Sequence, residues 1–145
     1  MDIRMTRIKG ITLLELMVTL AIVSILASVA IPTYQSYMQR GNRSEAISAL
    51  QSVMQAQERF YADAVSYTVD LSDLGFATAT FDTDNGLYTI SARQCEDGAG
   101  NAVAITQCVE LEATALGTQD SDGDLVLNSY GAQSRILPDA SVADW

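Results

Sequence analysis

The sequence predicts an α+β protein in which a long, bent amino-terminal helix packs on a small antiparallel β-sheet head. Residues 11–31 form a largely apolar run, and apolar residues then recur at three- or four-residue steps, which is typical of a helix with one buried face. From Gly86 onward, apolar and polar residues alternate, which is typical of strands. We therefore expect a helix over residues 11–62, a connecting loop over 63–85 and a sheet over 86–145.

The composition argues against most catalytic and nucleic-acid functions. The 145 residues contain no histidine, so neither a Ser-His nor a Cys-His pair can form, and the two cysteines cannot complete a four-ligand zinc site. The net charge of −10 opposes binding to phosphate backbones, and the sequence has no glycine-rich phosphate-binding motif. Paired carboxylates such as Glu110 and Glu112 are commonly just solvated. We therefore expect no enzymatic activity and no direct contact with nucleic acid.

The segment from Ile11 to Ile31 is long enough to cross a bilayer. Its 21 residues would span roughly 30 Å as a helix, and three basic residues precede it, so we expect the amino terminus in the cytoplasm and the rest outside. A plain membrane anchor and a secretory signal cut after Ala30 both fit this pattern. Neither explains Glu15, because a charged side chain costs about 2.5–3.5 kcal/mol at the bilayer centre. Glu15 therefore indicates either a positively charged partner or a glutamate that reaches the interface.

The residues around this segment resemble a known processing signal. The run KGITLLE from Lys9 to Glu15, followed by the apolar segment and IPTY at residues 31–34, resembles the class III signal of type IV prepilins. In that family a membrane-embedded peptidase cuts after the glycine and methylates the new amino terminus. The resemblance therefore implies a leader peptide of residues 1–10, cleavage between Gly10 and Ile11, N-methylation of Ile11, and the pilin lollipop fold. The family usually has phenylalanine after the cut, where this chain has Ile11.

Cleavage after Gly10 would give Glu15 a counter-ion. It creates an amine on Ile11, one helical turn away, which could pair with Glu15 of the same chain or of a neighbouring subunit. A buried polar pair of this kind can set the register of an assembly. The resemblance likewise implies that Glu15 is needed for filament assembly. Pro32 is expected to bend the helix where the apolar run ends, because proline removes a helical hydrogen bond.

The alternating region predicts a disulfide-linked hairpin. Strands are expected over residues 87–93 and 103–113, and alternation with period two assigns Cys95 and Cys108 to the same polar face. Outside the cytoplasm we expect this pair to form a disulfide worth about 3 kcal/mol, with two free thiols as the alternative. A third strand over residues 125–129 would complete the sheet.

Three alternating carboxylates, those of Asp120, Asp122 and Asp124, form a weak candidate for a calcium site, and no other cofactor is expected. The spacing differs from an EF-hand, which needs a glycine at the sixth position and a carboxylate at the twelfth. A solvated acidic turn is the alternative. Major pseudopilins of type II secretion resemble this chain at the amino terminus and hold calcium near their carboxyl end, although the hairpin disulfide fits pilins better.

Together these features predict a structural subunit of a type IV pilus, and residues 56–61, 66–68 and 74–76 resemble minor pilins. The resemblance implies a single-pass inner-membrane precursor with a cytoplasmic amino terminus. Prepilin peptidase/methyltransferase would process it, and the inner-membrane pilus assembly platform would pass it into a helical filament of pilin subunits. The extracellular pilus would serve motility, adhesion or DNA uptake. The alternatives are a pseudopilin of a type II secretion system and a membrane-tethered extracytoplasmic binding domain.

Overall fold

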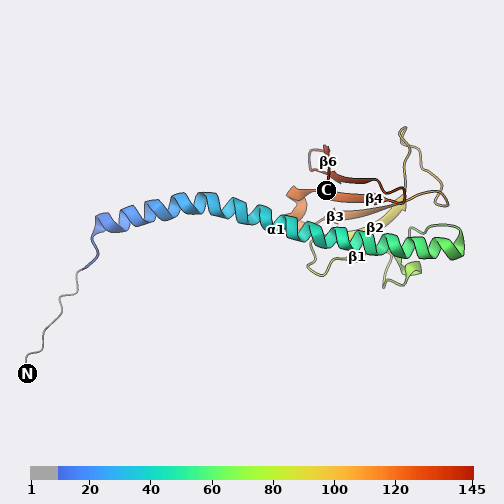
Figure 1. The fold of residues 1–145 in the computed structure, drawn as a ribbon, viewed down its shortest axis with the longest axis horizontal. Helices are drawn as coiled ribbons and strands as arrows, with labels where there is room; N and C mark the ends of the chain where they lie inside the picture. Colours follow the sequence, from blue (N-terminus) through green and yellow to red (C-terminus); the bar gives the residue numbers. More distant parts are fainter. Residues whose placement is uncertain (1–9) are drawn as a thin grey trace, which may run out of the picture. The chain divides into compact units, whose positions relative to one another are not determined.

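One helix and a small sheet make up the described part of this computed structural model, which covers residues 10–145 (Figure 1). Helix α1 spans Leu13–Ala64, where the sequence predicted a helix over residues 11–62. The chain divides into two compact units at the boundary between Met38 and Gln39. Of the leader expected at residues 1–10, only Gly10 belongs to the described residues.

The part of α1 before Gln39 is apolar on every side. All of its large apolar side chains are exposed, including those of Leu13 and Tyr37. An 18-residue window of the helix has a mean hydropathy of 2.4, so α1 is long and apolar enough to cross a membrane. A helix that is hydrophobic all round needs lipid or other helices around it. α1 also continues through Pro32 without a break. The proline removes one backbone hydrogen bond, and the other residues of this 52-residue helix keep theirs.

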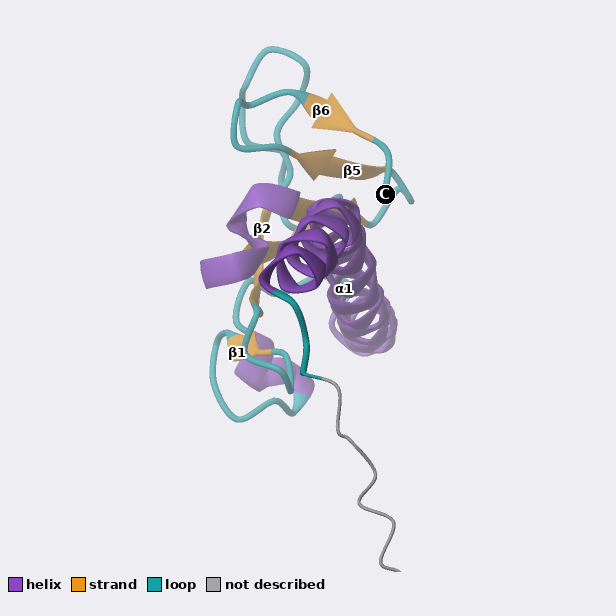
Figure 2. Cartoon of the chain, turned by 90° about the vertical axis from the view of Figure 1, so that its left-hand side faces the viewer, coloured by secondary structure: helices purple, strands orange, loops and turns teal. Residues whose placement is uncertain are grey.

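The second unit, residues 39–145, is called the head below. Its antiparallel sheet has six strands, and each pairs with the next along the chain, so that β1 and β6 form the edges (Figure 2). The strands are β1 (Phe81–Asp82), β2 (Tyr88–Gln94), β3 (Val109–Ala115), β4 (Asp124–Asn128), β5 (Gln133–Ile136) and β6 (Val142–Ala143). Two 3₁₀ helices, η1 (Leu71–Leu74) and η2 (Gly117–Asp122), lie in the connections.

The sheet differs from the expected three strands in two respects. The strand predicted over residues 103–113 begins only at Val109, because the Ala104 carbonyl accepts hydrogen bonds from the N–H groups of Gln107 and Cys108 and closes a turn there. Three strands were also not predicted: β1, which lies with η1 inside the expected loop of residues 63–85, and β5 and β6. β1 and β6 have two residues each and β5 has four, which is too short for alternation to be recognised.

One face of the head's helical segment packs on the sheet. The core is formed by Ala46, Leu50 and Val53 of α1 and by inward residues of the strands, namely Tyr88, Ile90, Leu111, Ala113, Ala115, Leu125 and Leu127, together with Leu71. Tyr88 and Ile90 of β2 alternate with outward residues, as the predicted strand pattern requires. Ile47 and Met54 of α1 are only partly buried, whereas the smaller Ala46 is completely buried.

The disulfide between Cys95 and Cys108 is confirmed, but its predicted surroundings are wrong. The two cysteines lie just beyond the last paired positions of the hairpin, Cys95 after Gln94 and Cys108 before Val109, with a Cα–Cα distance of 5.6 Å. Both cysteines are buried rather than placed on an exposed polar face. The Ser129 hydroxyl lies 3.5 Å from the Cys108 sulfur. Burial of this kind depends on the β4–β5 turn, which alternation within the hairpin could not reveal.

Gly123 is the position where the fold tolerates a side chain least. Its φ is +91°, and a Cβ atom would lie 2.3 Å from the Ile136 carbonyl oxygen of the paired strand β5. Its ψ of 173° completes a backbone conformation that is essentially restricted to glycine. We expect Gly123→Ala to lower the free energy of unfolding by about 1–3 kcal/mol for this conformation, plus about 1–3 kcal/mol for the contact. Gly131→Ala is the matched control, because Gly131 has a φ of +83° and open space around it. Equal losses in urea unfolding of the two variants would contradict the close contact.

Candidate functional site

The peptide bond that is expected to be cut lies just before the first turn of α1. Gly10, Ile11 and Thr12 precede the helix and are exposed. The Thr12 hydroxyl accepts a hydrogen bond from the Glu15 N–H at 3.2 Å, and the Thr12 carbonyl accepts one from the Leu16 N–H at 3.1 Å. Thr12 is therefore the N-cap of α1 and Glu15 its third residue, in a capping-box pattern. The peptide bond between Gly10 and Ile11 lies in non-helical backbone.

Glu15 forms no ion pair with a cation of the described residues. Its side chain is exposed, and none of the ion pairs found over residues 10–145 includes it. Its position in the first turn is electrostatically favourable, because the amino-terminal end of a helix carries partial positive charge. The structure thus keeps Glu15 close to Ile11 along the chain and leaves its carboxylate open for a partner.

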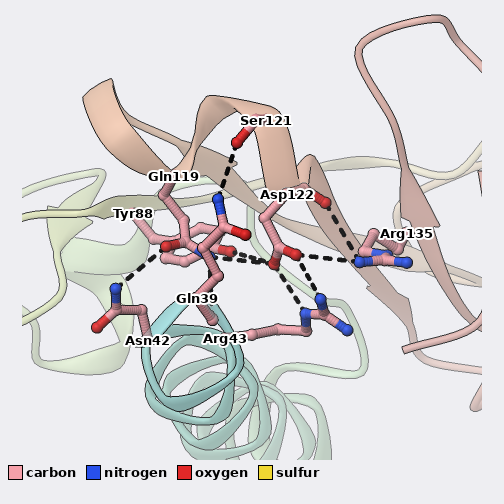
Figure 3. Close-up of polar contacts among 8 residues, drawn as sticks. All are labelled: Gln39, Asn42, Arg43, Tyr88, Gln119, Ser121, Asp122 and Arg135. Carbon is pink, nitrogen blue, oxygen red and sulfur yellow. Dashed lines mark hydrogen bonds and ion pairs between the residues drawn. The ribbon is translucent and has the colours of Figure 1, made fainter. Parts of the chain in front are cut away.

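A second polar centre lies in the head around the Asp122 carboxylate (Figure 3). Arg43 of α1 forms two hydrogen bonds with it, one from Nε to Oδ2 at 2.8 Å and a shorter one from Nη2 to Oδ1. Arg135 of β5 donates from Nη1 to Oδ1 at 3.1 Å. Gln119 and Tyr88 donate to Oδ2 at 3.0 and 3.3 Å. One carboxylate therefore links the helix to β2, η2 and β5.

Further polar contacts hold the same part of α1 to the head. The Gln39 amide donates to the Ser121 hydroxyl at 2.8 Å, and the Gln119 amide donates to the Gln39 carbonyl at 3.0 Å. The Asn42 amide donates to the Gln119 side-chain oxygen at 3.1 Å. In the described structure the helical part of the apolar core begins only at Ala46. Residues 39–43 of α1 are consequently attached to the head by hydrogen bonds and ion pairs.

The protonation of this centre follows from its burial and its donors. Burial alone would raise the pKa of Asp122, but the hydrogen bond and charge of Arg43, with Arg135 and Gln119, bring that pKa below its ordinary value. Burial raises the pKa of Tyr88 to about 12, so its hydroxyl remains protonated and able to donate to Asp122. At neutral pH the centre therefore consists of one carboxylate and two guanidinium groups.

The structure does not bring the three carboxylates of the predicted calcium turn together. Asp122 is buried and directed at the two arginines, whereas Asp120 is exposed. The Asp124 carboxylate accepts a hydrogen bond from the Ala115 N–H at 2.7 Å. Within residues 10–145 no group of three acidic, histidine or cysteine side chains is arranged to hold a metal ion. Asp122 of the acidic turn therefore pairs with two arginines in the described structure.

Sequence reasoning missed the two arginines that engage Asp122. Arg43 and Arg135 lie 79 and 13 residues away from it, so no local motif connects the three positions. The sequence offered one indication, the small number of basic residues in the head. The head has sixteen acidic side chains and only five arginines, with no lysine or histidine, so a buried carboxylate there is expected to pair with an arginine. A third arginine, Arg93, bridges Glu110 at 2.7 Å and Glu112 at 3.1 Å on the outer face of the sheet. This carboxylate pair, expected to be solvated, is thus partly neutralised.

Comparison with known protein families accounts for both parts of the chain. The prokaryotic N-terminal methylation motif matches residues 5–31. The family model described as "Type IV minor pilin ComP, DNA uptake sequence receptor" matches residues 32–125. The chain belongs to the type IV pilin family. The resemblance carried by Gly10, Glu15 and the apolar helix is thereby confirmed at the level of the family.

Individual pilins show the same relationship. The chain is 35% identical over 111 residues to the fimbrial protein EcpC of Eikenella corrodens, which covers 77% of this chain and 69% of that protein. It is 33% identical over 130 residues to the type IV major pilin PilA of Myxococcus xanthus, covering 90% of this chain and 54% of PilA. The identity to the major pilin PilE of Neisseria gonorrhoeae is 40% over 72 residues, or 50% of this chain and 43% of PilE. These matches favour a pilin over a type II secretion pseudopilin.

The ion cluster of this pilin gives a pH dependence whose sign can be worked out. Because the folded-state pKa of Asp122 is lowered, its contribution to stability is complete above the unfolded value near 4 and is lost as the pH falls through the folded value. Asp122→Asn should lower the free energy of unfolding at pH 7 by about 3 kcal/mol, since it leaves two largely buried guanidinium groups without a counter-charge. Denaturant unfolding from pH 7 to pH 2 should show this difference shrinking below about pH 4. Asp120→Asn, at an exposed position of η2, should show neither effect.

Chelation tests whether the acidic turn binds calcium. Since Asp122 is occupied by two arginines, we expect excess EDTA to leave the melting temperature of the pilin unchanged. A calcium ion at about 100 times its Kd would instead contribute about 2.7 kcal/mol to the native state. A lower melting temperature in EDTA that calcium restores would show that the turn binds the ion despite this arrangement.

Proposed function

We propose that this pilin is a structural, non-enzymatic subunit of a type IV pilus, and more specifically a minor subunit. The observation that carries the proposal is the segment from Leu13 to Met38, whose large apolar side chains are all exposed in a chain that otherwise has a well-packed core. Such a helix is stable in a bilayer or inside a bundle of like helices. The match of the minor pilin family model to residues 32–125 supports the minor subunit.

The proposed route begins in the inner membrane. The basic residues before the apolar segment place the amino terminus in the cytoplasm and the head outside. Prepilin peptidase/methyltransferase cuts between Gly10 and Ile11 and methylates Ile11, which agrees with the methylation motif over residues 5–31. The inner-membrane assembly platform then moves the subunit into a helical filament of pilins, which becomes extracellular.

Glu15 has a defined part in this route. Processing creates a positively charged amine on Ile11, next to the Thr12 cap and one turn from Glu15. Leaving the membrane for the filament core keeps both groups away from water, so each charge needs the other. We propose that the Glu15 carboxylate of a subunit in the filament receives the amine of an incoming subunit.

The family description names DNA uptake. We propose that the filament as a whole carries out such a task and that the head of this subunit does not bind the DNA phosphates directly. Of the five arginines in the head, Arg43, Arg93 and Arg135 form ion pairs with acidic side chains. The excess of acidic side chains in the head repels the phosphates of a DNA backbone. A filament subunit can serve DNA uptake, adhesion or motility through assembly alone.

Replacing Glu15 tests the proposal by separating membrane insertion from assembly. Glu15→Val should insert at least as well as the wild type, because a carboxylate is removed from an apolar helix. It should be cut after Gly10 but fail to enter filaments, since the incoming amine would lack its partner at a cost of about 3–5 kcal/mol. The measurement compares the sheared filament fraction with the membrane fraction at equal expression. Ser24→Val is the matched control, because the Ser24 hydroxyl contacts only the Leu20 carbonyl of its own helix.

Intact mass of the membrane-extracted protein makes this experiment interpretable. A mature chain beginning at Ile11 is expected for the wild type and both variants. A chain beginning at Ile31 would contradict the pilin route, because the segment that bundles would be gone. Equal recovery of Glu15→Val and wild type in sheared filaments would remove the pairing role of Glu15.

A further inference from the structure

The Asp122 centre contains more positive than negative charge. Arg43 and Arg135 share a single carboxylate, and both donate to the same oxygen, Oδ1. The side chains of the two arginines are only 17% and 18% exposed, and that of Asp122 is 6% exposed. One net positive charge is thus held in a largely desolvated position. A buried charge without a counter-ion costs free energy, so a second anion beside the two arginines would stabilise the centre.

One donor of this centre has no acceptor in the structure. The Nε atom of Arg135 is buried and is the single side-chain nitrogen or oxygen of that kind without a hydrogen-bond partner in the described chain. All the remaining capacity of the carboxylate is used, because Oδ2 already accepts from Arg43, Gln119 and Tyr88. A buried donor without a partner indicates a water molecule or an ion at that position in the native protein.

The geometry of the two guanidinium groups suits an oxyanion. Figure 3 shows Arg43 and Arg135 approaching Asp122 on one side, while Tyr88 and Gln119 approach it on the other. Each guanidinium is a planar fork with five N–H donors, and Asp122 uses only part of each fork. Such forks bind carboxylate or phosphate oxygens through charge-assisted hydrogen bonds.

We propose that Arg43 and Arg135 form a binding site for a small oxyanion, a carboxylate or phosphate, which completes the charge balance of the Asp122 centre. The acidic surface of the head opposes a polyanion, so a compact anion is favoured over a nucleic acid. The oxyanion has two possible sources. One is a free ion, and the other is an acidic side chain of a second pilin subunit, a source that rests on the proposed function.

The test is thermal unfolding of the full-length chain in detergent with sodium phosphate and sodium acetate as probes, against sodium chloride at equal ionic strength. Wild type should show a saturable rise in melting temperature, of about 5 °C at ten times the Kd. Arg135→Gln, which keeps the two Arg43 hydrogen bonds to Asp122, should lose this rise. Arg40→Gln, at an exposed position of the same helix, should retain it. If Arg135→Gln does not fold, Arg135→Lys should show a reduced rise, because lysine keeps the charge without the planar fork.

The outcomes separate the proposal from its alternatives. No rise beyond that in chloride, or an equal rise in wild type and Arg135→Gln, would overturn the site. If the site is present, sheared filaments distinguish the two sources. Weaker filament recovery for Arg135→Gln, with cleavage after Gly10 unchanged, indicates a carboxylate from a neighbouring subunit. Unchanged recovery indicates a free ion. Because the melts require no filament, failure of the anion site and failure of the pilus proposal give different results.

Discussion

The ion pair between Asp122 and Arg43 fixes how the helical segment of the head, residues 39–64, lies on the sheet. Apolar contacts such as Leu50 and Val53 against the sheet supply most of the driving force, but they are non-directional and tolerate small shifts. Two hydrogen bonds from one guanidinium to one carboxylate allow a single register. Asp122 is itself held in place by Tyr88 of β2 and Arg135 of β5, so a shift of α1 would break the contact between Arg43 and a fixed carboxylate. Specifying register is the best-attested role of buried polar groups.

α1 serves two environments with one continuous helix. Before Gln39 its apolar residues are all exposed, and from Ala46 onward only one face is apolar and that face is covered by the sheet. Between these stretches, polar side chains of residues 39–43 hold the helix to η2. These polar contacts separate two apolar surfaces of α1. One surface packs on the sheet, and the other needs lipid or other helices around it.

The charge of the head constrains its partners. Three of its five arginines form ion pairs within the head, two of them with Asp122 and one, Arg93, on the outer face of the sheet. The surface therefore presents carboxylates to its surroundings, which fits contact with basic or neutral surfaces better than contact with DNA. Membership of a family whose model is described by DNA uptake is compatible with this, since assembly and direct DNA contact are separate tasks.

The sequence by itself determined the features that depend on residues close together in the chain. The apolar run, the Gly10 to Glu15 pattern, the alternation in β2 and the pairing of Cys95 with Cys108 are all local, and the family and the α+β fold followed from them. Tertiary structure alone decided the burial of the disulfide, the short edge strands and the purpose of Asp122. The sequence shows this carboxylate beside those of Asp120 and Asp124, and only long-range folding brings Arg43 and Arg135 to it. A buried carboxylate needs a cation nearby. Which cation reaches it depends on residues far away in the chain, so the sequence of the turn does not reveal it.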